Sequence, residues 1–144
     1  MRIYLDNCCF NRPFDDQGEL RIRLETGAKL DVQRRIAIGD FELVWSYVLD
    51  LENAANPFDE RREVVAAWKT EAIFDVEETT YVLELARKVQ GYGVKSKDSL
   101  HIACAISANC EVFLSTDDVI LRKRNIISQI RILNPATFIT DDNP

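Results

Sequence analysis

Arg2-Ile3-Tyr4-Leu5-Asp6 is a short apolar run that ends abruptly on a carboxylate. Tyrosine, isoleucine and leucine in such a run are typical of a buried β-strand. A second apolar run, Val112-Phe113-Leu114, ends three residues before another carboxylate, Asp117. The two segments are therefore expected to be strands that each bring a carboxylate to an end of one sheet.

Amphipathic helical patterns alternate with short apolar runs along the rest of the chain. Further strands are expected at residues 41–46, 72–75 and 130–133. Helices are expected at residues 19–38, 47–55, 59–68, 77–90, 97–108 and 119–124, with caps at Asp59 and Ser96 and with a loop at residues 7–16. This alternation predicts an α/β fold, a three-layer α/β/α sandwich with a mainly parallel sheet of about five strands.

Composition and length indicate one ordinary globular domain over residues 1–144, with 47% hydrophobic residues and few glycines or prolines. No apolar run is long enough for a membrane span, and an early charge argues against a signal peptide, so a cytoplasmic location is expected. The cysteines form no CxxC pair and are expected to be reduced core thiols. A net charge of −6 excludes binding of nucleic acid by bulk attraction alone.

Four acids are expected near one edge of the sheet. Asp6 and Asp117 follow strands, while Glu52 and Asp98 lie on helices that begin near the same edge. Carboxylates brought together in this way, without histidine or thiolate partners, indicate a hard cation such as Mg²⁺ or Mn²⁺. The pattern has a second interpretation, because aspartates such as Asp98, Asp117 and Asp118 also cap helices or stabilise their first turns.

Four motifs in order along the chain resemble those of PIN-domain ribonucleases, the family of the prokaryotic VapC-like toxins. These motifs are IYLD at 3–6, SYVLDLE at 46–52, KDSLHIACA at 97–105 and VFLSTD at 112–117. The resemblance spans nearly the whole chain, and the D-x-L-H-x-A-x-A helix is its most recognisable part. It implies a PIN-like fold and metal-assisted hydrolysis of phosphodiester bonds in RNA.

Carried over by position, the resemblance implies Asp6, Glu52, Asp98 and Asp117 as catalytic acids. Asp6, Asp98 and Asp117 then hold one or two Mg²⁺ or Mn²⁺ ions, and Glu52 helps to orient the attacking water. Asp118 is the alternative fourth acid, depending on which hydroxyl before it matches the family pattern. The chain departs from that pattern directly after Asp6, where Asn7 and Cys8 replace the usual small hydroxyl residue.

Substrate contacts are expected from Ser115, Arg12, Lys97 and Arg122, the last two in basic segments that flank the third and fourth acids. The resemblance also implies RNA as the partner, a role as the toxin of a type II toxin–antitoxin pair with a cognate antitoxin, and a homodimer. His101 lies on the inward face of its helix and is expected to be a hydrogen-bonded core histidine.

Two other functions fit the same pattern. A PIN-like scaffold that binds RNA or protein without catalysis keeps the fold, although all four acids are intact. A receiver-type signalling domain also places strand-end acids around magnesium. It requires an acidic pair after the first strand and a lysine after the last, whereas Asn7 follows Asp6 and Asn134-Pro135 follows Leu133.

Overall fold

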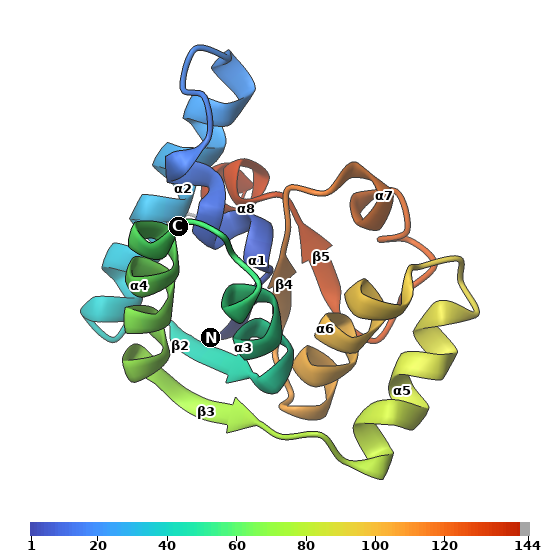
Figure 1. The fold of residues 1–144 in the computed structure, drawn as a ribbon. Coiled ribbons are helices and arrows are strands. Elements are labelled where there is room, and N and C mark those ends of the chain that lie inside the picture. Colours follow the sequence, from blue (N-terminus) through green and yellow to red (C-terminus); the bar gives the residue numbers. More distant parts are fainter. Residues whose placement is uncertain (142–144) are drawn as a thin grey trace.

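A parallel sheet of five strands forms the centre of the protein, for which a computed structural model describes residues 1–141 (Figure 1). The strands are β1 (Arg2–Leu5), β2 (Glu42–Ser46), β3 (Ala72–Val76), β4 (Val112–Leu114) and β5 (Arg131–Leu133). Their order across the sheet is β3-β2-β1-β4-β5, and every neighbouring pair is parallel. The predicted strands and the parallel sheet are confirmed.

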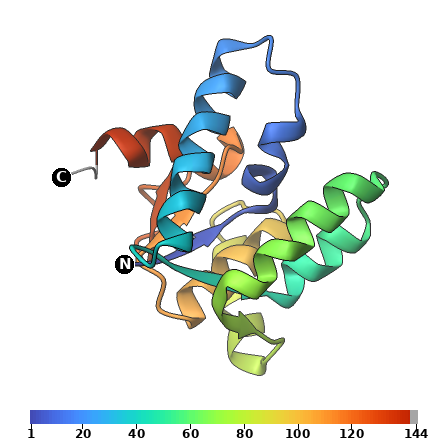
Figure 2. The same ribbon diagram turned by 90° about the vertical axis from the view of Figure 1, so that its left-hand side faces the viewer.

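Helices cover both faces of this sheet, which gives the predicted three layers. They are α1 (Asn7–Asn11), α2 (Leu20–Ala37), α3 (Tyr47–Ala54), α4 (Asp59–Ala67), α5 (Thr80–Gln90), α6 (Ser96–Ser107), α7 (Asp118–Leu121) and α8 (Pro135–Asp141). Short 3-10 turns lie at Arg12–Phe14 and Trp68–Glu71. The helices α2 and α8 pack together on one face, and α5 and α6 pack together on the other (Figures 1 and 2). No helix in the described part of the chain is long and apolar enough to cross a membrane.

The strand order explains why a site forms at one edge. From β1 the chain moves outward through β2 to β3, and then returns to place β4 on the other side of β1. The carboxyl ends of β1 and β4 are therefore the topological switch point, where parallel α/β sheets bind their ligands. Ile3 pairs in register with both Leu43 and Val112, and all three residues are fully buried.

Aromatic side chains fill the core below that edge. The ring of Tyr4 stacks on Phe113 at 5.4 Å between centroids, and Phe10 meets Trp45 edge-to-face at 5.4 Å. All four side chains are almost completely buried. The four cysteines are free thiols and three of them are buried, as expected for packing residues.

Several predicted boundaries are wrong for local reasons. The expected loop at 7–16 contains α1, because the Asp6 carboxylate caps a helix by accepting from the backbone of Asn7. The helix expected from 77 begins at Thr80, where the hydroxyl of Thr79 caps it. Asp59 and Ser96 are the first residues of their helices rather than the caps.

The last helix, α8, was not expected from the sequence. Its start has a recognisable signal, because the Asn134 side chain accepts from the backbone N–H of Ala136 at 2.9 Å and Pro135 occupies the first helical position. The basic helix expected at 119–124 is shorter than predicted and ends at Leu121.

Lys29 is a charged residue buried in this core, and its replacement by methionine is expected to stabilise the fold. The Lys29 side chain of α2 is only 3% exposed, and its Nζ lies 5.7 Å from the centroid of the Phe10 ring. Burial lowers the pKa of Lys29 to about 8, against a small opposing effect of Cys9. Lys29→Met should therefore raise the free energy of unfolding at pH 7 by about 1–3 kcal/mol, measured by urea denaturation.

The sign of the pH dependence follows from the lowered pKa. Between pH 8 and 10.5 the unfolded chain keeps a proton on Lys29 that the folded chain has released, so stability of the wild type rises with pH in that window. The advantage of Lys29→Met should shrink as pH rises from 8 to 10.5. A difference that stays the same at pH 7 and at pH 10 would contradict a burial cost.

Candidate active site

Asp6 is the anchor of the site, at the carboxyl end of β1. Its side chain is only 7% exposed, but hydrogen-bond donors surround it. The backbone N–H of Asn7 donates to Oδ1 at 2.8 Å, and the hydroxyl of Ser115 donates to Oδ2 at 2.8 Å. The thiol of Cys8 lies 3.4 Å from Oδ2. A carboxylate held by three neighbours has a fixed direction, which is the requirement for a binding group.

Ser115 also organises the end of β4. Its side chain is fully buried, and its Oγ accepts from the backbone N–H of Asp117 at 3.1 Å. Asp117 in turn caps α7, with its carboxylate accepting from Val119 at 2.8 Å. Ser115 therefore connects the first and fourth acids, Asp6 and Asp117, through one hydroxyl group.

Asp98 lies close enough to the other acids for their charges to affect it. It is half-buried in the first turn of α6. Burial raises the pKa of Asp98 to about 6, and the negative charges of Asp6, Asp117 and Glu52 add to the increase, while His101 opposes it. Burial is the largest cause of this shift, and the three like charges that add to it indicate an excess of negative charge around Asp98.

Glu52 reaches the same edge from the second turn of α3. Its Oε1 lies 2.5 Å from Nε2 of His101. Although burial raises the pKa of Glu52, the hydrogen bond to His101 and the charge of Lys97 outweigh it, and the pKa lies below the ordinary value. Glu52 is therefore an ionised carboxylate with one oxygen already occupied.

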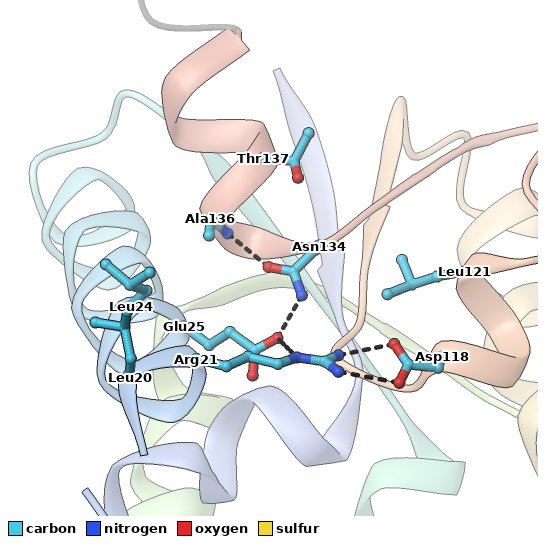
Figure 3. Close-up of a pocket in the computed structure, with 9 residues that line it drawn as sticks. All are labelled: Leu20, Arg21, Leu24, Glu25, Asp118, Leu121, Asn134, Ala136 and Thr137. Carbon is cyan, nitrogen blue, oxygen red and sulfur yellow. Dashed lines mark hydrogen bonds and ion pairs between the residues drawn. The ribbon is translucent and has the colours of Figure 1, made fainter. Parts of the chain in front are cut away.

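Asp118, the alternative fourth acid, is turned away from this cluster. Both of its carboxylate oxygens pair with the guanidinium of Arg21, at 3.0 and 2.8 Å (Figure 3). Arg21 belongs to α2 and also donates to Glu25. Together with Asp118, these residues line a pocket of about 390 Å³ between α2, α7 and α8 (Figure 3). The geometry therefore favours Asp117 as the fourth member of the acid cluster.

Comparison with known proteins gives the family. The sequence model of the PIN domain matches residues 3–126. The chain belongs to the PIN domain family. No curated protein sequence matches the chain.

Two solved structures share the fold of this PIN domain. One is FitAcB from Neisseria gonorrhoeae, with 14% identity and a TM-score of 0.57, over 92% of this chain and 97% of that one. The other is VapBC2 from Rickettsia felis, bound to a DNA fragment from their promoter, with 12% identity and a TM-score of 0.57. That match covers 93% of this chain and 98% of the other.

Divalent metals are typical of PIN domains, and the donor set of this one suits a hard cation. Asp6, Glu52, Asp98 and Asp117 offer only carboxylate oxygens, the ligands that Mg²⁺ and Mn²⁺ prefer. Within residues 1–141, however, no three His, Cys, Asp or Glu side chains are close enough together to hold an ion as they stand. The residues fit such a cation by chemistry and charge, and a closer approach of the carboxylates is needed to bind it.

The residues expected to contact substrate differ in how free they are. Lys97 and Arg122 are exposed near the ends of α6 and α7. Arg12 is engaged within the protein, since its guanidinium pairs with Glu25 at 2.8 Å and with Asp15 at 3.0 Å. Ser115 is fully buried behind Asp6, where its hydroxyl is used to orient acids.

His101 contacts the site, although it was expected only as a core histidine. It is fully buried and hydrogen-bonded, as expected for a core histidine. Its partners, however, are Glu52 on one ring nitrogen and Tyr4 on the other. Its position one helical turn after Asp98 is the available signal, because residues three apart share a helix face.

Proposed function

We propose that this PIN domain is an endoribonuclease that uses Mg²⁺ or Mn²⁺ to hydrolyse phosphodiester bonds in RNA. The observation that supports the proposal is that Asp98 lies close enough to Asp6, Asp117 and Glu52, near the switch point of the sheet, for their charges to affect it. Burial, and then the charges of Asp6, Asp117 and Glu52, raise the pKa of Asp98 to about 6. Like charges brought this close destabilise a fold, and a divalent cation balances them.

In the proposed mechanism, Asp6, Asp98 and Asp117 would hold the metal. A bound divalent cation supplies a Lewis acid that polarises a phosphoryl oxygen and lowers the pKa of bound water. Glu52, with Oε1 on His101, uses its remaining oxygen to accept a hydrogen bond from the attacking water. By family analogy the products carry a 3′-hydroxyl and a 5′-phosphate.

Contacts to RNA come from groups around the acids. The exposed side chains of Lys97 and Arg122 flank Asp98 and Asp117 in sequence and bind phosphates of the RNA backbone. Arg12 contributes after exchange of one of its carboxylate partners for phosphate. Ser115 contributes indirectly, by holding Asp6 and the backbone of Asp117.

The proposal includes a biological role as the toxin of a type II toxin–antitoxin pair, in the cytoplasm. Its support is the resemblance of the four motifs to VapC-like toxins and the shared fold with FitAcB and VapBC2. A cognate antitoxin and a second copy of the chain are the expected protein partners. Exposed apolar side chains such as Leu24, Leu51 and Phe58 supply surface of the kind that protein partners cover.

Incubation with a panel of single-stranded and structured RNAs tests the proposed reaction. Cleavage is expected with Mg²⁺ or Mn²⁺ and not with chelator, and end-group analysis should find 5′-phosphates. Cleavage that persists in chelator would contradict the proposed chemistry. A protein that binds these RNAs with and without metal but cuts none of them would instead be the non-catalytic scaffold.

A further inference from the structure

A continuous chain of buried hydrogen bonds ends on Glu52. It begins at Ser46, which caps α3 by accepting from the backbone N–H of Leu49 at 3.3 Å. The Ser46 hydroxyl lies 2.6 Å from the Tyr4 hydroxyl, and the Tyr4 hydroxyl lies 2.6 Å from Nδ1 of His101. Nε2 of His101 lies 2.5 Å from Oε1 of Glu52. Ser46, Tyr4 and His101 are all fully buried, so water does not compete for these bonds.

Only one direction of donation satisfies every atom of this chain with a neutral imidazole. Because Ser46 Oγ accepts from Leu49, its own hydrogen is free to be donated to the Tyr4 hydroxyl. Tyr4 then donates to Nδ1 of His101, which must be the unprotonated nitrogen. The proton of the ring therefore lies on Nε2, where it is donated to the Glu52 carboxylate.

The opposite tautomer is unfavourable in this geometry. A proton on Nδ1 leaves Nε2 with a lone pair, which faces the carboxylate oxygen of Glu52 at 2.5 Å. Two acceptors in contact inside a buried site repel each other and leave both without a donor. A ring protonated on both nitrogens still donates to Glu52, but it donates to the Tyr4 hydroxyl instead of accepting from it. The additional proton on Nδ1 distinguishes this state from the neutral ring.

We propose that Tyr4 holds His101 as the Nε2–H tautomer and that His101 thereby fixes the orientation of Glu52 at the acid cluster. His101 and Tyr4 are positioning residues, since neither is placed to touch RNA. The tautomer follows from the hydrogen bonds alone, and only its effect on catalysis rests on the proposed nuclease function. Second-layer hydrogen bonds of this kind typically change activity or metal affinity by about 10- to 100-fold.

The chain contains a single histidine, so the tautomer can be measured without ambiguity. Nitrogen-15 NMR of the imidazole in the wild-type protein should show a protonated Nε2 and an unprotonated Nδ1. Tyr4→Phe keeps the stacked ring but removes the hydroxyl, and should shift the Nδ1 resonance, because this nitrogen loses its hydrogen-bond donor while Nε2 keeps its proton, which is donated to Glu52. Tyr81→Phe, at an exposed tyrosine of α5, is the control and should leave the spectrum unchanged. A wild-type ring with its proton on Nδ1, or on both nitrogens, overturns the proposal.

The catalytic consequence is tested by two replacements of His101. His101→Gln keeps a side-chain N–H donor, whereas His101→Leu keeps only the bulk. We expect kcat to fall about 100-fold in His101→Leu, with KM nearly unchanged, and to recover by about 10-fold in His101→Gln. Equal losses in both variants would overturn the positioning role. Absence of RNA cleavage by the wild type would overturn the nuclease function, while the NMR spectrum still decides the tautomer.

Discussion

Asp98→Asn is expected to lower the rate of RNA cleavage by at least about 10²- to 10³-fold, which is the scale of removing one essential electrostatic group from an active site. The amide has the shape of the carboxylate but lacks the charge that holds a cation. Because the pKa of Asp98 is raised first by burial and then by the charges of Asp6 and Asp117, losing its charge removes repulsion. The folded state of the variant should therefore be at least as stable as the wild type.

The neighbouring pair Asp117 and Asp118 supplies a matched control in adjacent positions. Asp117→Asn should reduce the rate as strongly as Asp98→Asn, because its charge acts on Asp98. Asp118→Asn should change the rate by less than about threefold, since Asp118 is exposed and paired with Arg21. Single-turnover rates with the same RNA, together with melting temperatures, decide the matter. If Asp118→Asn loses as much activity as Asp98→Asn while Asp117→Asn stays active, then Asp118 and not Asp117 is the fourth acid.

Glu25→Ala should have the largest effect on stability, about 3–5 kcal/mol in the free energy of unfolding. Glu25 is only 1% exposed, and its carboxylate accepts from three side chains, of which Figure 3 shows Arg21 and Asn134. Arg12 pairs with Oε1 at 2.8 Å, Arg21 pairs with Oε2 at 3.1 Å, and the amide of Asn134 donates to Oε2. Removal of the carboxylate takes a buried partner from both arginines, which keep only Asp15 and Asp118, and leaves the amide of Asn134 at the start of α8 without this acceptor.

Urea denaturation measures this loss against a surface ion pair. Asp59 pairs with Arg62 while its side chain is 82% exposed, so Asp59→Ala should cost less than about 1 kcal/mol. Similar losses in the two variants would contradict the structural importance of the Glu25 network. Because Arg21 also holds Asp118, Glu25→Ala is further expected to loosen the connection between α2 and α7.

The parallel sheet was predictable because its central strands carry their own signals. β4 is fully apolar, and β1 is apolar after Arg2; such runs indicate strands buried on both faces. The same strand assignments predict that Asp6 and Asp117 lie at one edge of the sheet, because parallel strands bring their carboxyl ends together there. Asp98 and Glu52 were expected near this edge because their helices begin there, whereas the roles proposed for them depend on the motifs around them.

The features that sequence reasoning missed depend on contacts between distant segments. The helix α1 begins because Asp6 caps it, yet an aspartate after a strand is equally compatible with a loop. Tyr4 and Glu52 meet on His101 although they lie 97 and 49 positions away along the chain. Likewise, Asp118 is distinguished from Asp117 by Arg21, 97 positions earlier, and no local pattern carries that information.

Binding of Mn²⁺ in the absence of RNA tests the central claim, that the acids at the carboxyl edge form a cation site. The wild-type protein and Asp98→Asn, prepared in parallel, are titrated with Mn²⁺ while the free ion is followed by electron paramagnetic resonance. We expect saturable binding of one or two ions to the wild type and at least tenfold weaker binding to the variant. Equal binding by both proteins, or none by either, would contradict the assignment of Asp6, Asp98 and Asp117 as the metal site.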